Sequence, residues 1–162
     1  MTDYKIPAQT SIGHVHLKVA DLDRALAFWH GVLGFELQQR FGAQAAFISA
    51  GGYHHHIGLN TWESAGGPAP AAGTTGLYHV AVLYPTRRDL AIAVKRVLAA
   101  GVPLTGASDH GVSEAFYLND PDGNGVELYW DRPAAEWPRD PSGGVGMFSR
   151  RLDVDAVLAL AE

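Results

Sequence analysis

The chain has 162 residues, of which 47% are hydrophobic, with a formal net charge of −5 and no cysteine. This length and composition are those of a globular protein with one domain or two small, closely packed halves. The negative charge argues against nucleic acid or an anionic membrane as partner, and the missing cysteines exclude a disulfide framework and a thiol nucleophile. Without a signal-peptide pattern or a bilayer-spanning apolar run, we expect a cytoplasmic protein.

The first half of the chain has the pattern of a β-α-β-β-β module over about residues 10–63, preceded by an arm. Alternating residues predict a strand over 11–19. Asp21 is suited to cap a helix over 22–33, and Gly34 is suited to end it. Three further strands are expected at 35–40, 45–49 and 54–61.

The second half has the same pattern over about residues 77–131. A Gly/Pro/Ala-rich linker covers 64–76. A strand from residue 77, a helix over 88–100, a short strand at 102–104 and strands at 115–119 and 126–130 follow, with a turn at Asp120–Gly123. A tail over 132–162 contains a short helix from about 153 to 161. We expect one domain over 1–162.

The two modules are a sequence repeat. Residues 12–19 are echoed by 77–84, and residues 57–62 by 126–130, which pairs His14 with His79 and Gly58 with Glu127. Neither module can bury both faces of its own sheet. We therefore predict an α+β fold in which two βαβββ modules pair into a curved, barrel-like sheet around a metal-centred cavity.

Two histidines and one carboxylate at equivalent places suit a metal ion with open coordination positions. The alternatives are a core histidine at position 14 and, for Glu127, a place on the solvent face of an edge strand. His16 shares a strand face with His14 and is expected to line the cavity rather than to bind the metal.

The chain resembles the vicinal oxygen chelate superfamily, which includes glyoxalase I, extradiol dioxygenases, fosfomycin-inactivating thiol transferases and bleomycin-binding proteins. The resemblance covers nearly all of 11–130. It rests on Gly13-His14-Val15, Phe28-Trp29, Leu33-Gly34-Phe35, Tyr78-His79-Val80 and the run from Asn119 to Leu128. It implies that His14, His79 and Glu127 are metal ligands.

Several positions favour extradiol chemistry within that superfamily. Gly58 stands where glyoxalase I has a carboxylate or glutamine, which disfavours that enzyme and the four-ligand epimerases. His55-His56 before Ile57-Gly58 is similar to the segment that carries the acid–base histidine of extradiol enzymes, and strand parity selects His56. A solvent-facing histidine-rich turn is the alternative.

Two further residues match the extradiol pattern. Tyr117 lies ten residues before Glu127, the spacing of the active-site tyrosine in extradiol enzymes, although a core tyrosine is an alternative. His110 lies in a loop similar to the one that carries a histidine supporting the active site in those enzymes, and a surface histidine is its alternative. The resemblance thus implies catalytic roles for His56 and Tyr117 and supporting roles for His16 and His110.

The implied function is that of a short, single-domain catechol 2,3-dioxygenase-like enzyme of aromatic degradation. It would use Fe(II), with Mn(II) or another divalent metal as the alternative, to cleave a catechol-type substrate with O2. Well-studied extradiol enzymes are about twice as long, and many relatives form homodimers. The alternatives are a fosfomycin-type thiol transferase, disfavoured because His16 replaces the hydroxyl residue such enzymes need, a glyoxalase-like lyase, and a non-enzymatic small-molecule- or antibiotic-binding module.

Overall fold

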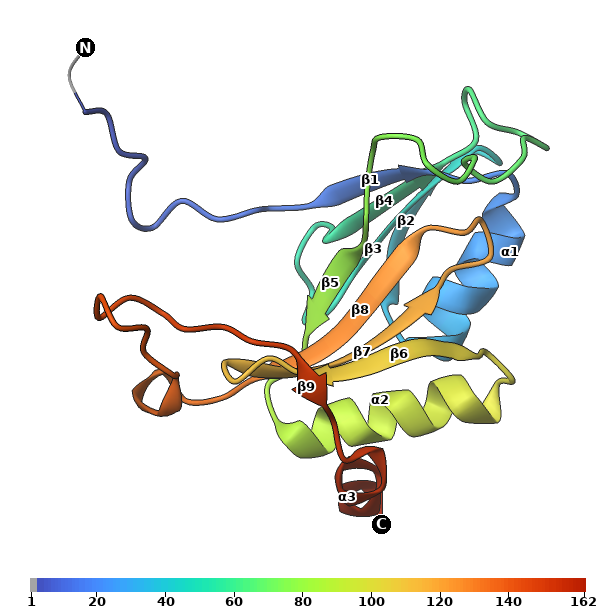
Figure 1. Cartoon of the computed structure of the whole chain (residues 1–162). Helices are drawn as coiled ribbons and strands as arrows, with labels where there is room; N and C mark the ends of the chain where they lie inside the picture. Colours follow the sequence, from blue (N-terminus) through green and yellow to red (C-terminus); the bar gives the residue numbers. More distant parts are fainter. Residues whose placement is uncertain (1–2) are drawn as a thin grey trace.

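The computed structural model describes residues 3–162 as a mixed α+β fold with two curved sheets (Figure 1). The first sheet has the strand order β1-β4-β3-β2, and the second has the order β5-β8-β7-β6-β9. The strands of the first sheet are β1 Val15–Lys18, β2 Glu36–Phe41, β3 Ala45–Ser49 and β4 Ile57–Asn60. Those of the second are β5 Val80–Leu83, β6 Leu104–Asp109, β7 Ser113–Asn119, β8 Gly125–Asp131 and β9 Arg150–Arg151.

Each module closes in the same way, because its last strand lies parallel to its first strand. β4 pairs with β1 so that His16 is the partner of Gly58, and β8 pairs with β5 so that Ala81 is the partner of Glu127. The predicted α+β fold of two βαβββ modules is confirmed. The modules form two sheets rather than one continuous sheet, and β1 and β5 each stand at a sheet edge.

The first helix differs in type from the prediction. Helix α1 covers Leu22–Leu26, and residues Ala27–Val32 continue it as a π-helix, in which the Leu33 N–H bonds to the Phe28 carbonyl five residues back. Asp21 caps the N-terminus through the Arg24 N–H, and Gly34 follows the end with φ +85°. Trp29, in the widened segment, is fully buried. The prediction over 22–33 thus had the right extent, but local periodicity does not distinguish an α-turn from a π-turn.

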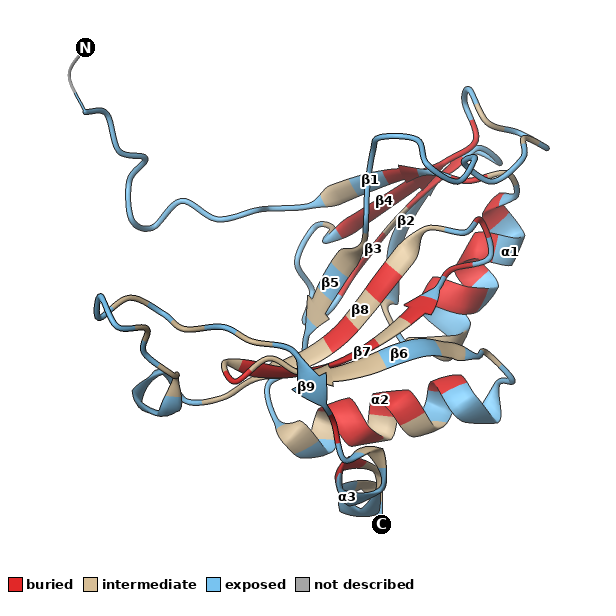
Figure 2. Cartoon of the chain, viewed as in Figure 1, coloured by how far each residue is buried: buried red, intermediate tan, exposed pale blue. Residues whose placement is uncertain are grey.

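Helix α2 covers Arg87–Ala99 and packs on the second sheet with one apolar face, seen as its red face in Figure 2. Thr86 caps it by accepting a hydrogen bond from the Asp89 N–H at 3.0 Å. Helix α3, Val154–Leu158, packs against α2 near the C-terminus. Both modules contribute to one apolar core, whose largest fully buried side chains are Trp29, Phe116, Ile48, Leu59, Leu90, Leu118 and Leu128.

The remaining differences lie outside the core. β6 is twice as long as the expected short strand at 102–104 and lies further along the chain, because its Thr-Gly-Ala-Ser-Asp stretch carries no apolar alternation. β9 and a 3₁₀ turn at Ala134–Glu136 were not predicted. Within residues 3–162, no helix has the length and apolar character needed to cross a membrane.

The turn between β7 and β8 joins the two modules through buried carboxylates. Asp122 Oδ1 accepts hydrogen bonds from the Ala20 N–H at 2.8 Å and from the Arg24 guanidinium at 2.6 Å. Asp120 accepts from the N–H groups of Asp122 and Asn124, and the Trp29 indole lies 3.4 Å from its Oδ2. The turn therefore holds the end of β1 and the first helix against the second sheet.

We expect Asp122→Ala to lower the free energy of unfolding by about 2 kcal/mol, since it leaves a half-buried arginine and a backbone N–H without their acceptor. Asp23→Ala is the matched control. It removes an Asp–Arg contact of the same length, 2.6 Å to Arg40, but its side chain is 83% exposed against 9% for Asp122. The control is expected to cost less than about 0.5 kcal/mol. Urea denaturation measures the free energy of unfolding of both variants. Equal losses would contradict the role of Asp122 in joining the two modules.

Candidate metal and substrate site

His79 and Glu127 form the closest pair among the residues expected to bind a metal. His79 directly precedes β5, and Glu127 lies in the middle of the neighbouring strand β8. Their Nε2 and Oε2 atoms are 2.9 Å apart, with the carboxylate side chain only 12% exposed. The other ring nitrogen of His79, Nδ1, is buried and finds no hydrogen-bond partner within residues 3–162. The pair therefore directs one nitrogen and one carboxylate oxygen toward the same small volume.

Tyr117 stands directly opposite Glu127 across the β7–β8 hairpin. Its hydroxyl lies 3.3 Å from Glu127 Oε1 and 2.7 Å from His110 Nε2. Burial, reinforced by the nearby carboxylate, raises the pKa of Tyr117 to about 12, so the phenol keeps its proton at neutral pH. His79, His110 and Tyr117 line one cavity of about 540 Å³.

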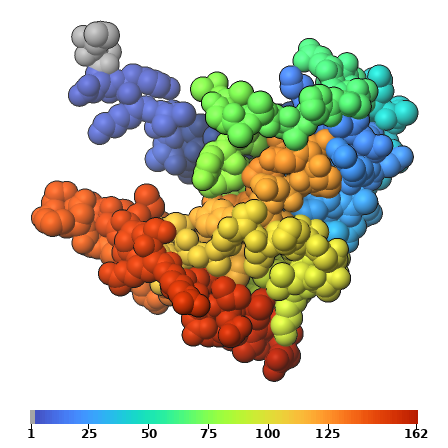
Figure 3. Space-filling view, turned by 45° about the vertical axis from the view of Figure 1, so that its right-hand side comes forward, coloured from blue at the N-terminus to red at the C-terminus, as the bar shows by residue number. Residues whose placement is uncertain are grey.

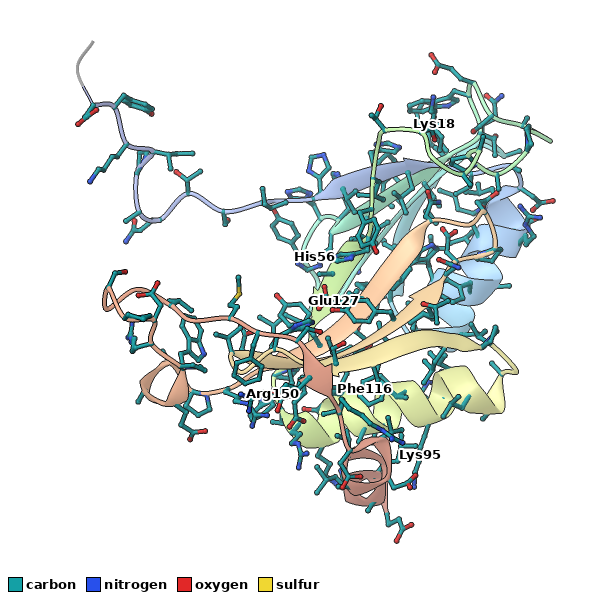
Figure 4. The ribbon with its side chains drawn as sticks, viewed as in Figure 1. Lys18, His56, Lys95, Phe116, Glu127 and Arg150 are labelled. Carbon is teal, nitrogen blue, oxygen red and sulfur yellow. The ribbon has the colours of Figure 1, made fainter. Side chains whose placement is uncertain are left out.

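His14 and His56 line a different cavity, of about 670 Å³, between the edge strands β1 and β5. His14 precedes β1, is exposed, and places its ring 4.4 Å from that of His55. His56 precedes β4, and its Nδ1 accepts a hydrogen bond from the Ala50 N–H at 3.2 Å. In Figure 4, His56, directly before β4, and Glu127, in β8, come from different modules. Among residues 3–162, no three His, Asp or Glu side chains are placed so that they could hold one metal ion.

The position equivalent to Glu127 in the first module is filled by the ring of His16. A Cβ atom added to Gly58 would lie 2.8 Å from His16 Nδ1, so the glycine makes room for the ring. Asn60 Nδ2 donates a hydrogen bond to His16 Nε2 at 2.9 Å, and burial together with His14 lowers the pKa of His16. The first module thus sets a large residue on β1 against a small one on β4, and the second reverses this with Ala81 and Glu127.

Two contacts of the site were not anticipated from the sequence. One is the Asn60 amide that holds His16, and the other is the Phe148 backbone carbonyl, 2.9 Å from His110 Nδ1. Asn60 follows Gly58 at the same-face spacing of two residues, which is a signal that could have found it. The Phe148 contact uses only a main-chain atom, so no residue type marks it.

We expect Gly58→Ala to destabilise the protein by about 1–3 kcal/mol, because the new methyl group overlaps the His16 ring. The double variant His16→Ala/Gly58→Ala should regain most of this loss. Gly31→Ala is the control, since its Cβ would meet nothing closer than 4.0 Å. Thermal unfolding of the unmodified protein, His16→Ala, Gly58→Ala, the double variant and the control measures the coupling, and additive effects of the two substitutions would contradict the packing of His16 on Gly58.

The chain is similar to known proteins over most of its length. Residues 11–128 match the family described as the Glyoxalase/Bleomycin resistance protein/Dioxygenase superfamily. The chain is 40% identical over 153 residues to a catechol-2,3-dioxygenase of Bacillus subtilis (strain 168), covering 94% of this chain and 53% of that protein. It is 30% identical over 120 residues to biphenyl-2,3-diol 1,2-dioxygenase 3 of Rhodococcus globerulus, covering 74% of this chain and 63% of that one.

The chain thus spans between half and two thirds of the length of these two relatives. Among solved structures, a glyoxalase/dioxygenase from Nostoc punctiforme superimposes with a TM-score of 0.65 at 18% identity, covering 82% of this chain and 99% of that one, which establishes likeness of fold. The repeat, the fold and the family match together place the chain in the Glyoxalase/Bleomycin resistance protein/Dioxygenase superfamily, the vicinal oxygen chelate proteins.

Proposed function

We propose that this protein is a metal-dependent extradiol dioxygenase that opens the ring of a catechol-type aromatic with O2. The observation that carries the proposal is the His79–Glu127 pair, with Tyr117 and His110 beside it. The similarity to relatives named as catechol and biphenyl-diol dioxygenases supports the same reaction class.

The donor chemistry of the pair fits a divalent cation. The 2.9 Å separation is that of a direct imidazole–carboxylate contact, and it is also close to the distance of about 3 Å between two neighbouring ligand atoms that each lie about 2.1 Å from an octahedral cation. Two imidazoles and a carboxylate leave positions free for substrate and O2, which makes Fe(II) the first choice and Mn(II) the second. His14, the repeat partner of His79, is the proposed third ligand. When bound, such a cation supplies electron transfer between an electron-rich diol and O2.

The cavity lined by His14 and His56 suits an aromatic ring. Its walls include Val15, Phe35, Ile57 and Val80. Because His56 Nδ1 accepts the Ala50 N–H, a neutral His56 carries its hydrogen on Nε2. We propose that His56 donates that hydrogen to an oxygen of the bound substrate and acts as the acid–base residue.

Substitution of the two paired donors tests the metal site. We expect His79→Ala and Glu127→Ala each to abolish stoichiometric Fe(II) binding in anaerobically purified protein, while His30→Ala, whose ring instead lies beside the Phe35 carbonyl, leaves binding unchanged. Metal analysis and calorimetric titration measure this. Full iron occupancy in both donor variants would overturn the assignment.

Replacement of His56 separates catalysis from metal binding. We expect His56→Ala to bind Fe(II) like the unmodified protein but to lower turnover of catechol about 100-fold, because the acid–base group is lost. His54→Ala, two residues earlier, is the matched control and should keep its activity. The yellow ring-opened product is followed by absorbance. If the unmodified protein instead held Mn(II), transferred glutathione and opened no ring, a thiol transferase would be favoured.

A further inference from the structure

His110 lies in the short loop between β6 and β7, beside the C-terminal part of the chain. Figure 3 shows the yellow hairpin of these two strands with the orange and red C-terminal segment lying against it. The loop closes with the His110 N–H donating to the Ser113 carbonyl at 2.9 Å. Because the His110 ring contacts the Tyr117 hydroxyl at 2.7 Å, the conformation of this loop decides whether the ring reaches the site.

Two acidic residues stand directly opposite each other where the loop begins and ends. Asp109, the last residue of β6, is the register partner of Glu114 in β7. The Glu114 side chain is only 4% exposed, and that of Asp109 is 28% exposed. Like charges directly opposite each other in an antiparallel pair are destabilising, and burial adds to the cost. The hairpin that carries His110 therefore needs a cation between the two carboxylates.

Arg132, just after β8, supplies that cation. Its Nη2 atom lies 3.0 Å from Glu114 Oε1 and 3.1 Å from Asp109 Oδ2, so a single nitrogen joins both carboxylates. The Arg132 backbone N–H also donates to the Val112 carbonyl, inside the loop, at 2.8 Å. One residue thus holds both ends of the loop through its side chain and the loop itself through its backbone.

The two carboxylates are held by further contacts of different kinds. Glu114 Oε2 accepts from Arg87 Nε at 2.6 Å, which anchors it to the first residue of α2. Asp109 Oδ1 accepts from the Gly111 N–H at 2.8 Å. Burial alone would raise the pKa of Asp109, but the Gly111 N–H and the Arg132 guanidinium lower it overall, so this carboxylate is ionised at neutral pH. Arg132 is therefore the connection between the α2-anchored carboxylate and the loop.

We propose that Arg132 is a positioning residue of the site and acts through His110. By joining the two carboxylates, it fixes the hairpin loop in the conformation that sets the His110 ring against the Tyr117 hydroxyl. This inference deepens the proposed function and rests on it where turnover is concerned. The placement of the His110 ring can be measured without substrate or added metal, so failure of the Arg132 assignment and failure of the dioxygenase proposal are distinguishable.

The first test is NMR of the full chain with ¹³C-labelled histidine rings, in which the His110 signals are assigned by their loss in His110→Ala. We expect Arg132→Met, which removes the charge, to shift or broaden the His110 signals while those of His30, in the first module, stay unchanged. Arg132→Lys should preserve the His110 signals, because one ammonium nitrogen can donate to both carboxylates. Unchanged His110 signals in Arg132→Met would overturn the proposal.

The matched control is Arg40→Met, which removes another Asp–Arg contact, 2.6 Å to Asp23, on the first module. It should leave the His110 signals in place. Asp109→Asn keeps the proposal testable if Arg132→Met does not fold. The asparagine oxygen can still accept the Gly111 N–H, but its amide nitrogen cannot accept from Arg132. We expect the same change at His110, and its absence in Asp109→Asn would contradict the role of the bridge.

Turnover of catechol by the iron-loaded protein tests whether Arg132 acts through His110. We expect Arg132→Met to lower kcat about tenfold and to change KM less than about twofold, because a reacting-site group is misplaced while substrate binding is kept. Arg132→Lys should recover most of kcat, and Arg40→Met should match the unmodified protein.

The same substitution in a His110→Ala background separates the two explanations of a loss in kcat. If Arg132 acts through His110, Arg132→Met should lower kcat no further in that background. A second loss of about tenfold would show that Arg132 acts by another route and would overturn the proposal. Absence of ring opening in the unmodified protein would instead contradict the dioxygenase proposal, and the NMR result would still decide the role of Arg132.

Discussion

In each module, the last strand lies parallel to the first strand and pairs with it. Paired residues on the two strands therefore place their side chains in the same limited space on one face of the sheet. A large residue on one strand then requires a small one on the other. In the first module His16 occupies that space and Gly58 leaves it free, whereas in the second module Glu127 occupies it beside Ala81. This exchange of large and small residues explains why only the second module has a carboxylate at this position.

Hairpin geometry then brings the second-module residues together. β7 and β8 are antiparallel neighbours, so the ten-residue separation of Tyr117 and Glu127 becomes direct opposition, and the short loop after β6 returns His110 to the same place. Tyr117 and Glu127 lie in the second sheet, and His110 lies in the loop between its strands β6 and β7. His14 and His56 directly precede β1 and β4 of the first sheet, and the cavity they line lies between the edge strands of the two sheets, which are not paired with each other.

The parts of this arrangement that could be predicted are those set by local pattern. Alternation and repeat equivalence located most strands and the places of His79 and Glu127, because side-chain direction in a strand follows residue parity. The extent of β6 was not predictable, since its residues contribute little to the core, and neither was the π-helical turn around Trp29. How near His14 comes to His79 depends on the relative placement of the modules, which no local pattern encodes. The Phe148 contact uses a backbone oxygen, and every residue has one.

The Asp120–Asn124 turn has two roles within a few residues. It holds the first module to the second through Asp122, and it is also the loop that sets Tyr117 against Glu127. Loosening the junction between the modules would therefore also disturb the placement of Tyr117 opposite Glu127 in the hairpin. Heating such a molecule would disturb the site and the junction between the modules together. A substitution that improved one of the two would be retained in evolution only where it also preserved the other.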